Sequence, residues 1–433
     1  MNYLEAIKNQ SESLQAATPE WMHAIQARGR ALWSAQTWPG KKTEAWRYTS
    51  LVKVEKTLAS AQTGKAAGFE AAVAENTLQF KEALQVVIVD GRVQSVPDTL
   101  PEGLQLAAFS NLAEADQRSV AEKLGTVVET EKHLFAVQSE SLLSEGLYIK
   151  AKKNAAVSVP IYLVFIGSQA ANFRVFADLE QSASLTLVEH YLSLESEQEQ
   201  QLENTCTEFS LADNSQLNHY RLNMQAESAL HVGGVHAALA KHARLNSFYL
   251  AFGTALTRID AGVKHVGEGS HTNMYGVYLP RNNQHVDFHT NLEHCVPHTT
   301  SEEVFRGIVG DSARAVFNGR IHIYPQAQKT HAQLSNKNLL TSNKAEVDTK
   351  PELEIYANDV QCAHGATVAQ LEEKSLHYLR TRGISEEEAR VMLSFGFINE
   401  LIEQLELEAI RDYLRPILAK RFARSSELSQ HLL

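Results

Sequence analysis

Four short stretches decide the fold: Gln181-Ser-Ala-Ser-Leu185, Asn214-Ser-Gln-Leu217, Lys241-His-Ala-Arg-Leu245 and Asp311-Ser-Ala-Arg-Ala315. Each places small or polar residues immediately before a run that is rich in apolar residues. The first three end 32 and 28 residues apart, which leaves room for a second short strand in between. A repeating unit of this length is typical of a solenoid, in which each coil buries its apolar face against its neighbours.

Short β runs fill the chain from Leu134 to Val360. Clear examples are Val157 to Ile166, Leu185 to Leu192 and Ala315 to Tyr324. No stretch in this region has the apolar period of a helix. The pattern favours a β-helix, but its competitor is a large antiparallel sandwich or barrel, and periodicity alone does not separate the two.

The flanking regions have different patterns. Apolar residues recur at helical spacing through about residue 80, and Asp90-Gly91 between two apolar runs predicts a hairpin. At the other end, Ser385 to Glu388 form a capping box, in which the serine and the glutamate satisfy the first backbone amides of a helix. One apolar stripe is expected on this helix, from Ala389, Met392, Leu393, Gly396, Phe397, Leu401 and Leu405. We therefore expect a mixed helical domain over 1–135, a β-helix over 136–366 and a helical domain over 367–433.

Composition limits the classes of function. The net charge is −11, from 40 basic and 51 acidic residues, which does not favour a nucleic-acid or anionic membrane partner. No apolar run approaches the ~20 residues that a membrane span needs, and the N-terminus lacks the pattern of a secretory signal. The three cysteines, Cys206, Cys295 and Cys362, are far apart and odd in number. A reducing compartment is the natural inference, so we expect a cytoplasmic protein.

Cys362 and His364 form the candidate site. If their segment is extended, the two side chains point to the same side, about 7 Å apart along the strand. Both are soft or borderline metal ligands, and Gly365 is expected to end the strand beside a domain junction. The structural alternative is a buried thiol acting as a small hydrophobe beside a hydrogen-bonded histidine.

Other candidate constellations are weaker. The stretch from His285 to His298 is rich in potential metal ligands, which leaves a metal site as one interpretation. Strand alternation favours the other interpretation, a solvated face of a sheet formed by His285, Asp287, His289, Asn291 and Glu293. Asp287 and Glu293 share that face, but ~20 Å of extended strand would separate them, which is too far for a glycosidase pair. Gly64-Lys65 is followed by Ala66 and lacks the first glycine of the P-loop motif, so the chain is not expected to bind a nucleotide through a P-loop.

Several motifs resemble one known family. They are Trp46-Arg47-Tyr48-Thr49, Asn318-Gly319-Arg320, Lys350-Pro-Glu-Leu-Glu-Ile355, Asp359-Val-Gln-Cys362-Ala-His364-Gly365-Ala-Thr367 and Tyr378-Leu-Arg-Thr-Arg-Gly383. The chain resembles the SufD branch of the SUF iron–sulfur cluster assembly scaffolds. The resemblance implies a central right-handed parallel β-helix between the two flanking domains.

The resemblance also implies a function. A non-catalytic scaffold subunit of this kind pairs with a SufB-like paralogue through its β-helix and docks a SufC-like ATPase through its C-terminal helices. His364 and Cys362 become candidate ligands for iron or a transient iron–sulfur cluster shared with the partner. The candidate ATPase dock comprises Ser385, Glu388, Ala389, Met392, Leu393 and Phe397. Cys206 and Cys295 are expected to be structural. The alternatives are a free-standing β-helical enzyme acting on polysaccharide, and a SUF homodimer.

Overall fold

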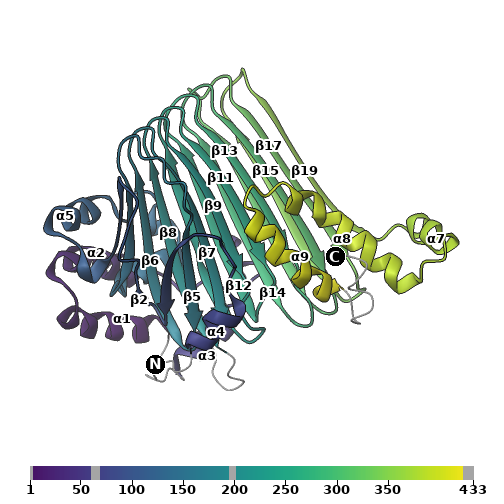
Figure 1. Ribbon diagram of the computed structural model, residues 1–433, viewed down its shortest axis with the longest axis horizontal. Coiled ribbons are helices and arrows are strands. Elements are labelled where there is room, and N and C mark those ends of the chain that lie inside the picture. The colour runs from purple at the N-terminus through teal and green to yellow at the C-terminus, as the bar shows by residue number, and fades with distance from the viewer. Residues whose placement is uncertain (1–2, 60–68, 195–200, 423–433) are drawn as a thin grey trace.

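The fold is built on two long β-sheets that face each other (Figure 1). The computed structural model describes residues 3–59, 69–194 and 201–422. Within these ranges the odd sheet has the order β19 (Gln361–Gln370), β17 (His331–Leu340), β15 (Thr300–Val309), β13 (His271–Tyr278), β11 (Arg244–Ala251), β9 (Gln216–Asn223), β7 (Ser184–Ser193), β5 (Ile161–Gly167), β1 (Leu84–Val89) and β2 (Arg92–Ser95). The even sheet has the order β18 (Glu346–Ile355), β16 (Arg314–Ile323), β14 (His285–His294), β12 (Leu256–His265), β10 (Leu230–Leu239), β8 (Leu202–Leu211), β6 (Ala170–Leu179), β4 (Gly146–Ala151) and β3 (Leu104–Ala108).

The strand pairing confirms the predicted parallel solenoid. From β4 onward, each strand pairs in parallel with the strand two places later in the sequence, so every coil gives one strand to each sheet. Leu185, Leu217 and Leu245, which end the first three repeated stretches, lie side by side in one row of the odd sheet. The stretch before Ala315 leads instead into the even sheet. The antiparallel sandwich is thereby excluded.

The repeated stretches are the turns between coils. Ser182, Asn214, His242 and Asp311 each have a φ between 52° and 58°, the left-handed region that L-residues seldom adopt. Asparagine and aspartate enter this region more easily than other residues, because their short polar side chains bond locally. The predicted hairpin is confirmed as well, since β1 and β2 pair antiparallel and both Asp90 and Gly91 have positive φ.

Apolar side chains fill the space between the two sheets. Aromatic rings from both sheets meet there, with Tyr249 6.1 Å from Phe288 and Phe305 5.0 Å from Phe317 between ring centroids. All four side chains are almost completely buried. A single coil could not bury such rings alone, so the core is continuous from coil to coil.

Most helices from the N-terminal region cover the outside of the even sheet. They are α1 (Tyr3–Leu14), α2 (His23–Ser34), α3 (Val52–Ala59), α5 (Glu114–Lys123) and α6 (Leu134–Ser141). Helix α4 (Phe69–Asn76) lies instead on the outside of the odd sheet, where Phe69 and Val73 pack against its outer cluster. Phe135 and Val137 of α6 belong to one buried cluster with Leu230 and Val232 of β10. Strands β1 to β3 also come from this region but join the two sheets, so the expected N-terminal domain and the solenoid share strands.

The described C-terminal helices are α7 (Glu373–Thr381), α8 (Glu386–Glu403) and α9 (Glu408–Phe422). Helices α8 and α9 lie against the outside of the odd sheet, whereas α7 extends away from it and contacts α8 (Figure 1). Ile398 of α8 and Leu414 of α9 are buried in one cluster with Val277 and Ile308 of the odd sheet. None of the described helices combines the length and hydropathy that a membrane crossing requires.

Two local predictions about the C-terminal region are wrong. The last strand does not end at Gly365 but continues to Gln370, because each of its ten residues pairs with β17. The apolar residues of α8 do not form the single stripe expected. Its buried face includes Val391, Ser394 and Ile398, whereas Met392 is 38% exposed. The division at residues 135 and 366 remains a prediction.

Candidate functional site at the open end of the solenoid

The last coil of the solenoid is open. Strands β18 and β19 end the even and odd sheets, so each has a neighbouring strand on one side only. Every residue of β19 except Cys362 is exposed, and most of β18 is half-buried. An edge of this kind presents backbone N–H and C=O groups that can pair with another strand.

Cys362 and His364 lie on this open coil with their side chains on one face, as the sequence predicts. Cys362 pairs with Ala332 and His364 with Leu334 in the parallel ladder, and both partners are core residues. The two side chains therefore point toward the space between the sheets, where the next coil would lie in a longer solenoid. His364 is exposed, and Cys362 packs half-buried against the core cluster.

Cys362 and His364 alone do not make a complete metal site. Burial raises the pKa of the Cys362 thiol, and the backbone amide of Ala332 opposes this in part, so the sulfur is a neutral thiol near neutral pH. Thiolate is the form that binds metal, and a cation beside the sulfur would lower the pKa. No group of three or more metal-ligating side chains is placed to hold an ion within the described ranges. The coil thus offers one sulfur and one imidazole, with room for further ligands from outside.

The two edge strands differ in character. The ten residues of β19 include no charged side chain and no proline. Strand β18 carries Pro351 and has charged side chains at alternate positions, among them Asp348, Lys350 and Glu354. Proteins usually protect an edge with charge or proline, so β18 has that protection and β19 lacks it. The exposed side chains of Ile355, Tyr356 and Val368 lie on the same last coil.

Behind the pair, the two rows of side chains pass through one apolar residue each and then reach a polar residue inside the core. The row of His364 runs through Leu334 to Glu303 on β15, and the row of Cys362 runs through Ala332 to Ser301. Glu303 is completely buried, and neither of its carboxylate oxygens has a hydrogen-bond partner among the described residues. Burial raises its pKa to about 8. Sequence analysis missed Glu303, because a Glu-Glu pair beside Val304 gives no sign of which carboxylate faces inward.

The predicted solvated stripe on β14 is wrong in part. Its apolar residues, among them Phe288, do lie in the core, but the opposite face is covered. Asp287 is 1% exposed and accepts hydrogen bonds from Arg258, at 2.7 Å, and from Thr49. The ring of Trp46 covers the Arg258 guanidinium at 4.3 Å. Burial raises the pKa of Asp287, but Arg258, His289 and Thr49 together outweigh burial and the net shift is downward.

Asp287 and Glu293, the two carboxylates considered for a glycosidase, both form hydrogen bonds or ion pairs with neighbouring side chains. Asp287 is held in the ion pair with Arg258, and Glu293 accepts hydrogen bonds from Asn291, at 2.8 Å, and from Tyr324, at 3.2 Å. Because each group has structural partners and the second is 4% exposed, this face does not present a pair of catalytic carboxylates.

The six residues of the candidate ATPase dock do not share one surface. Ser385 is the N-cap of α8, and its side chain accepts a hydrogen bond from the Glu388 amide at 3.2 Å, which agrees with the predicted capping box. Ala389 is fully buried, while Leu393 and Phe397 are half-buried. Met392 is exposed, and Tyr378 of α7, which sequence analysis did not single out, is 58% exposed. The exposed apolar side chains on α7 and α8 are therefore Tyr378 and Met392.

Comparison with known proteins identifies the family. The family model described as SUF system FeS cluster assembly, SufBD core domain, matches residues 165–397, which span the solenoid from β5 to α8. The chain belongs to the SufBD family. It is 30% identical to the iron–sulfur cluster assembly protein SufD of Escherichia coli, over 96% of this chain and 99% of that protein.

Two other relatives also match this SufBD protein over most of its length. An iron–sulfur cluster assembly SufBD family protein of Synechocystis is 27% identical over 96% of this chain and 95% of its own. Protein ABCI7, chloroplastic, of Arabidopsis thaliana is 26% identical over 87% of this chain and 81% of its own. The resemblance to SufD drawn from the motifs is confirmed.

Proposed function

We propose that this SufBD protein is a non-catalytic scaffold subunit in iron–sulfur cluster assembly, located in the cytoplasm. It pairs with a SufB-like subunit through the open end of its solenoid and docks a SufC-like ATPase through its C-terminal helices. His364, with Cys362 beside it, contributes ligands for iron or a nascent cluster that is completed at the boundary between the two subunits. The cluster is cargo that passes on and is not a resident cofactor.

The observation that carries the proposal is the coincidence of the ligand pair with an unprotected edge. β19 is uncharged and exposed at every residue except Cys362, and a strand from a second solenoid would satisfy its outer backbone groups. Cys362 and His364 sit on that strand and face the same opening. A second subunit that continues the sheet would therefore bring its own side chains next to both groups.

The ligand count supports a shared site. Iron–sulfur clusters are usually held by four cysteine thiolates, and histidine replaces some of them in known centres. Two ligands from this chain leave the coordination shell incomplete, so a partner subunit has to supply the others. Docking that forms such a shell would also lower the pKa of Cys362, because iron stabilises the thiolate.

The role of the C-terminal helices rests on two features. The sequence has no P-loop, so a nucleotide-driven step requires a separate ATPase. α7 projects from the end of the molecule, with Tyr378 exposed, and packs on α8, which in turn packs on the odd sheet (Figure 1). A protein bound to α7 and α8 would thus be connected mechanically to the solenoid.

Purification of the complex tests this function. Co-expression with a SufB-like and a SufC-like protein should give one complex that contains all three chains. His364→Ala should lower its iron and sulfide content while leaving assembly intact. His331→Ala, which removes an exposed imidazole from the neighbouring strand, is the matched control and should change neither. Unchanged iron and sulfide in the His364 variant would refute the site. A homodimer in the presence of both partners would refute the proposed pairing.

A further inference from the structure

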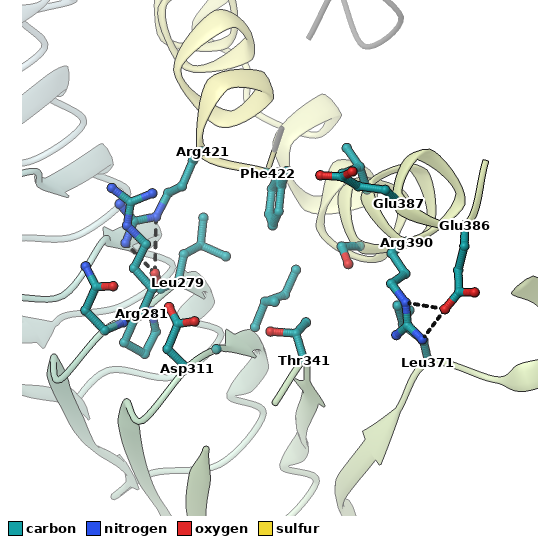
Figure 2. Close-up of a pocket in the computed structure, with 16 residues that line it drawn as sticks. Leu279, Arg281, Asp311, Thr341, Leu371, Glu386, Glu387, Arg390, Arg421 and Phe422 are labelled. Atoms are coloured by element: carbon teal, nitrogen blue, oxygen red, sulfur yellow. Dashed lines mark hydrogen bonds and ion pairs between the residues drawn. The ribbon is translucent and has the colours of Figure 1, made fainter. Parts of the chain in front are cut away.

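A cavity lies between part of the C-terminal helices and the turns at one side of the odd sheet (Figure 2). Its volume is about 850 Å³. The turns that follow β13 and β15 form one wall, with Arg281 and Asp311, and helices α8 and α9 form the other, with Arg390, Arg421 and Phe422. A volume of this size falls within the range of small-molecule sites.

Arg421 is the unusual residue of this cavity. Its guanidinium donates hydrogen bonds to the carbonyl of Leu279 at 2.6 Å and to that of Phe252 at 2.7 Å, and it approaches the side-chain oxygen of Gln284 at 3.3 Å. It also lies over the ring of Phe252, 4.4 Å from the centroid. All of these partners are neutral.

The fully buried arginines of the described residues have a different kind of partner. Arg174, Arg221 and Arg258 each form an ion pair with a carboxylate, and the last two do so at 2.6 and 2.7 Å. Within the described ranges no ion pair joins Arg421 to a carboxylate. Burial, together with the positive charge of Arg281, lowers its pKa to about 9, and the negative charge of Glu227 opposes this only in part. A positive charge at this position is thus incompletely balanced.

Among the described residues, no carboxylate that lines the cavity forms an ion pair with Arg421. Arg390 is paired with Glu386 at 2.9 Å, so these two groups neutralise each other on the α8 side. The Asp311 carboxylate accepts a hydrogen bond from the Asn282 amide at 3.0 Å. Arg281 has its closest ion pair with Glu227 at 3.5 Å, and both side chains are about half exposed. Glu387 is exposed on the first turn of α8.

We propose that this cavity binds a small anionic ligand, with a phosphate or carboxylate group held between Arg421 and Arg281. A guanidinium presents a planar fork of donors that matches either group, and charge-assisted hydrogen bonds are the stronger ones. Phe422 supplies an apolar surface beside the charged groups (Figure 2). Such a ligand would bridge α9 and the turns of the odd sheet, and so fasten the C-terminal helices to the solenoid.

Calorimetric titration of the full chain at low ionic strength tests the site. Inorganic pyrophosphate and citrate are used separately, because the first presents phosphate and the second carboxylate. The wild-type chain should bind at least one, and the preferred probe identifies the class of ligand. Arg281→Gln should weaken binding about tenfold or more, since a hydrogen bond to a charged group is lost.

Two further variants complete the design. Arg421→Gln should abolish binding, but it also removes bonds that attach α9, so the exposed Arg281 provides the deciding variant. Arg415→Gln lies on the same helix, pairs with Glu403 and does not line the cavity, so its affinity should equal that of the wild type. Failure of the wild-type chain to bind either probe, or equal affinity in the Arg281 variant, would overturn the proposal.

Discussion

Glu303→Gln is expected to stabilise the protein at neutral pH. The carboxyl is completely buried, and neither oxygen is hydrogen-bonded among the described residues. Burial raises its pKa from 4.5 to about 8, against a smaller opposing effect of the nearby Thr290 hydroxyl. The folded chain therefore keeps this proton at pH 7, whereas the unfolded chain releases it. Release favours the unfolded state, and glutamine removes that penalty because it resembles the protonated acid in shape and charge.

The size and the sign of the effect follow from proton linkage. One pKa unit corresponds to about 1.4 kcal/mol, so the gap between 4.5 and pH 7 is worth about 3 kcal/mol. Between its two pKa values the folded state binds more protons than the unfolded state, and wild-type stability falls as the pH rises through this window. Below pH 4.5 the acid is protonated in both states, so this difference between variant and wild type should vanish there.

Urea unfolding at a series of pH values measures the effect. Glu302→Gln is the matched control, because the adjacent carboxylate is exposed on the outer face and accepts a hydrogen bond from Tyr275 at 2.7 Å. The Glu302→Gln variant should therefore keep the decrease in stability with rising pH that Glu303 causes. A Glu303 variant that is no more stable than wild type at pH 7, or that keeps the same pH slope, would refute the reasoning.

Three further outcomes are expected. Asp287→Ala should lower the free energy of unfolding by about 3–5 kcal/mol, because it breaks a buried ion pair and leaves Arg258 with Asp260 as its one remaining carboxylate partner among the described residues. Urea unfolding tests this, and a loss below about 1 kcal/mol would contradict it. Phe305→Ala should cost about 3–5 kcal/mol by opening a hole between the sheets, and a melting temperature equal to that of the wild type would count against a close-packed interior. The double variant Tyr378→Ala/Met392→Ala should reduce co-purification of a SufC-like ATPase without changing the melting temperature, since both side chains are exposed; full retention of the ATPase would exclude this surface.

Local sequence signals favoured the solenoid without separating it from an antiparallel sandwich, and the family resemblance decided between the two. Asn214 and Asp311 mark turns with left-handed backbone, and alternation places Phe288 in the core. The direction of Cys362 and His364 followed from the same alternation. These features depend on neighbouring residues, so a single sequence contains them.

The incorrect predictions concern features that depend on contacts between residues far apart in the sequence. The β14 face looked solvated, but Thr49, more than two hundred residues earlier in the chain, covers Asp287. The strand carrying Gly365 continues because β17 pairs with all of it, and such pairing outweighs the weak strand propensity of glycine. On α8, Val391, Leu393 and Phe395 place apolar groups on several sides, so the amphipathic pattern did not identify which face the odd sheet would bury.

The two ends of the solenoid are unlike, and this sets how it can assemble. At the start, the sheets finish in short antiparallel strands, β2 with four residues and β3 with five. At the finish, β18 and β19 each offer ten residues in extended form. Head-to-tail addition, which would generate filaments, lacks a matching template at the first end. Growth by edge pairing is consequently self-limiting: two solenoids that meet at their long edges leave only the short, blunted strands outside.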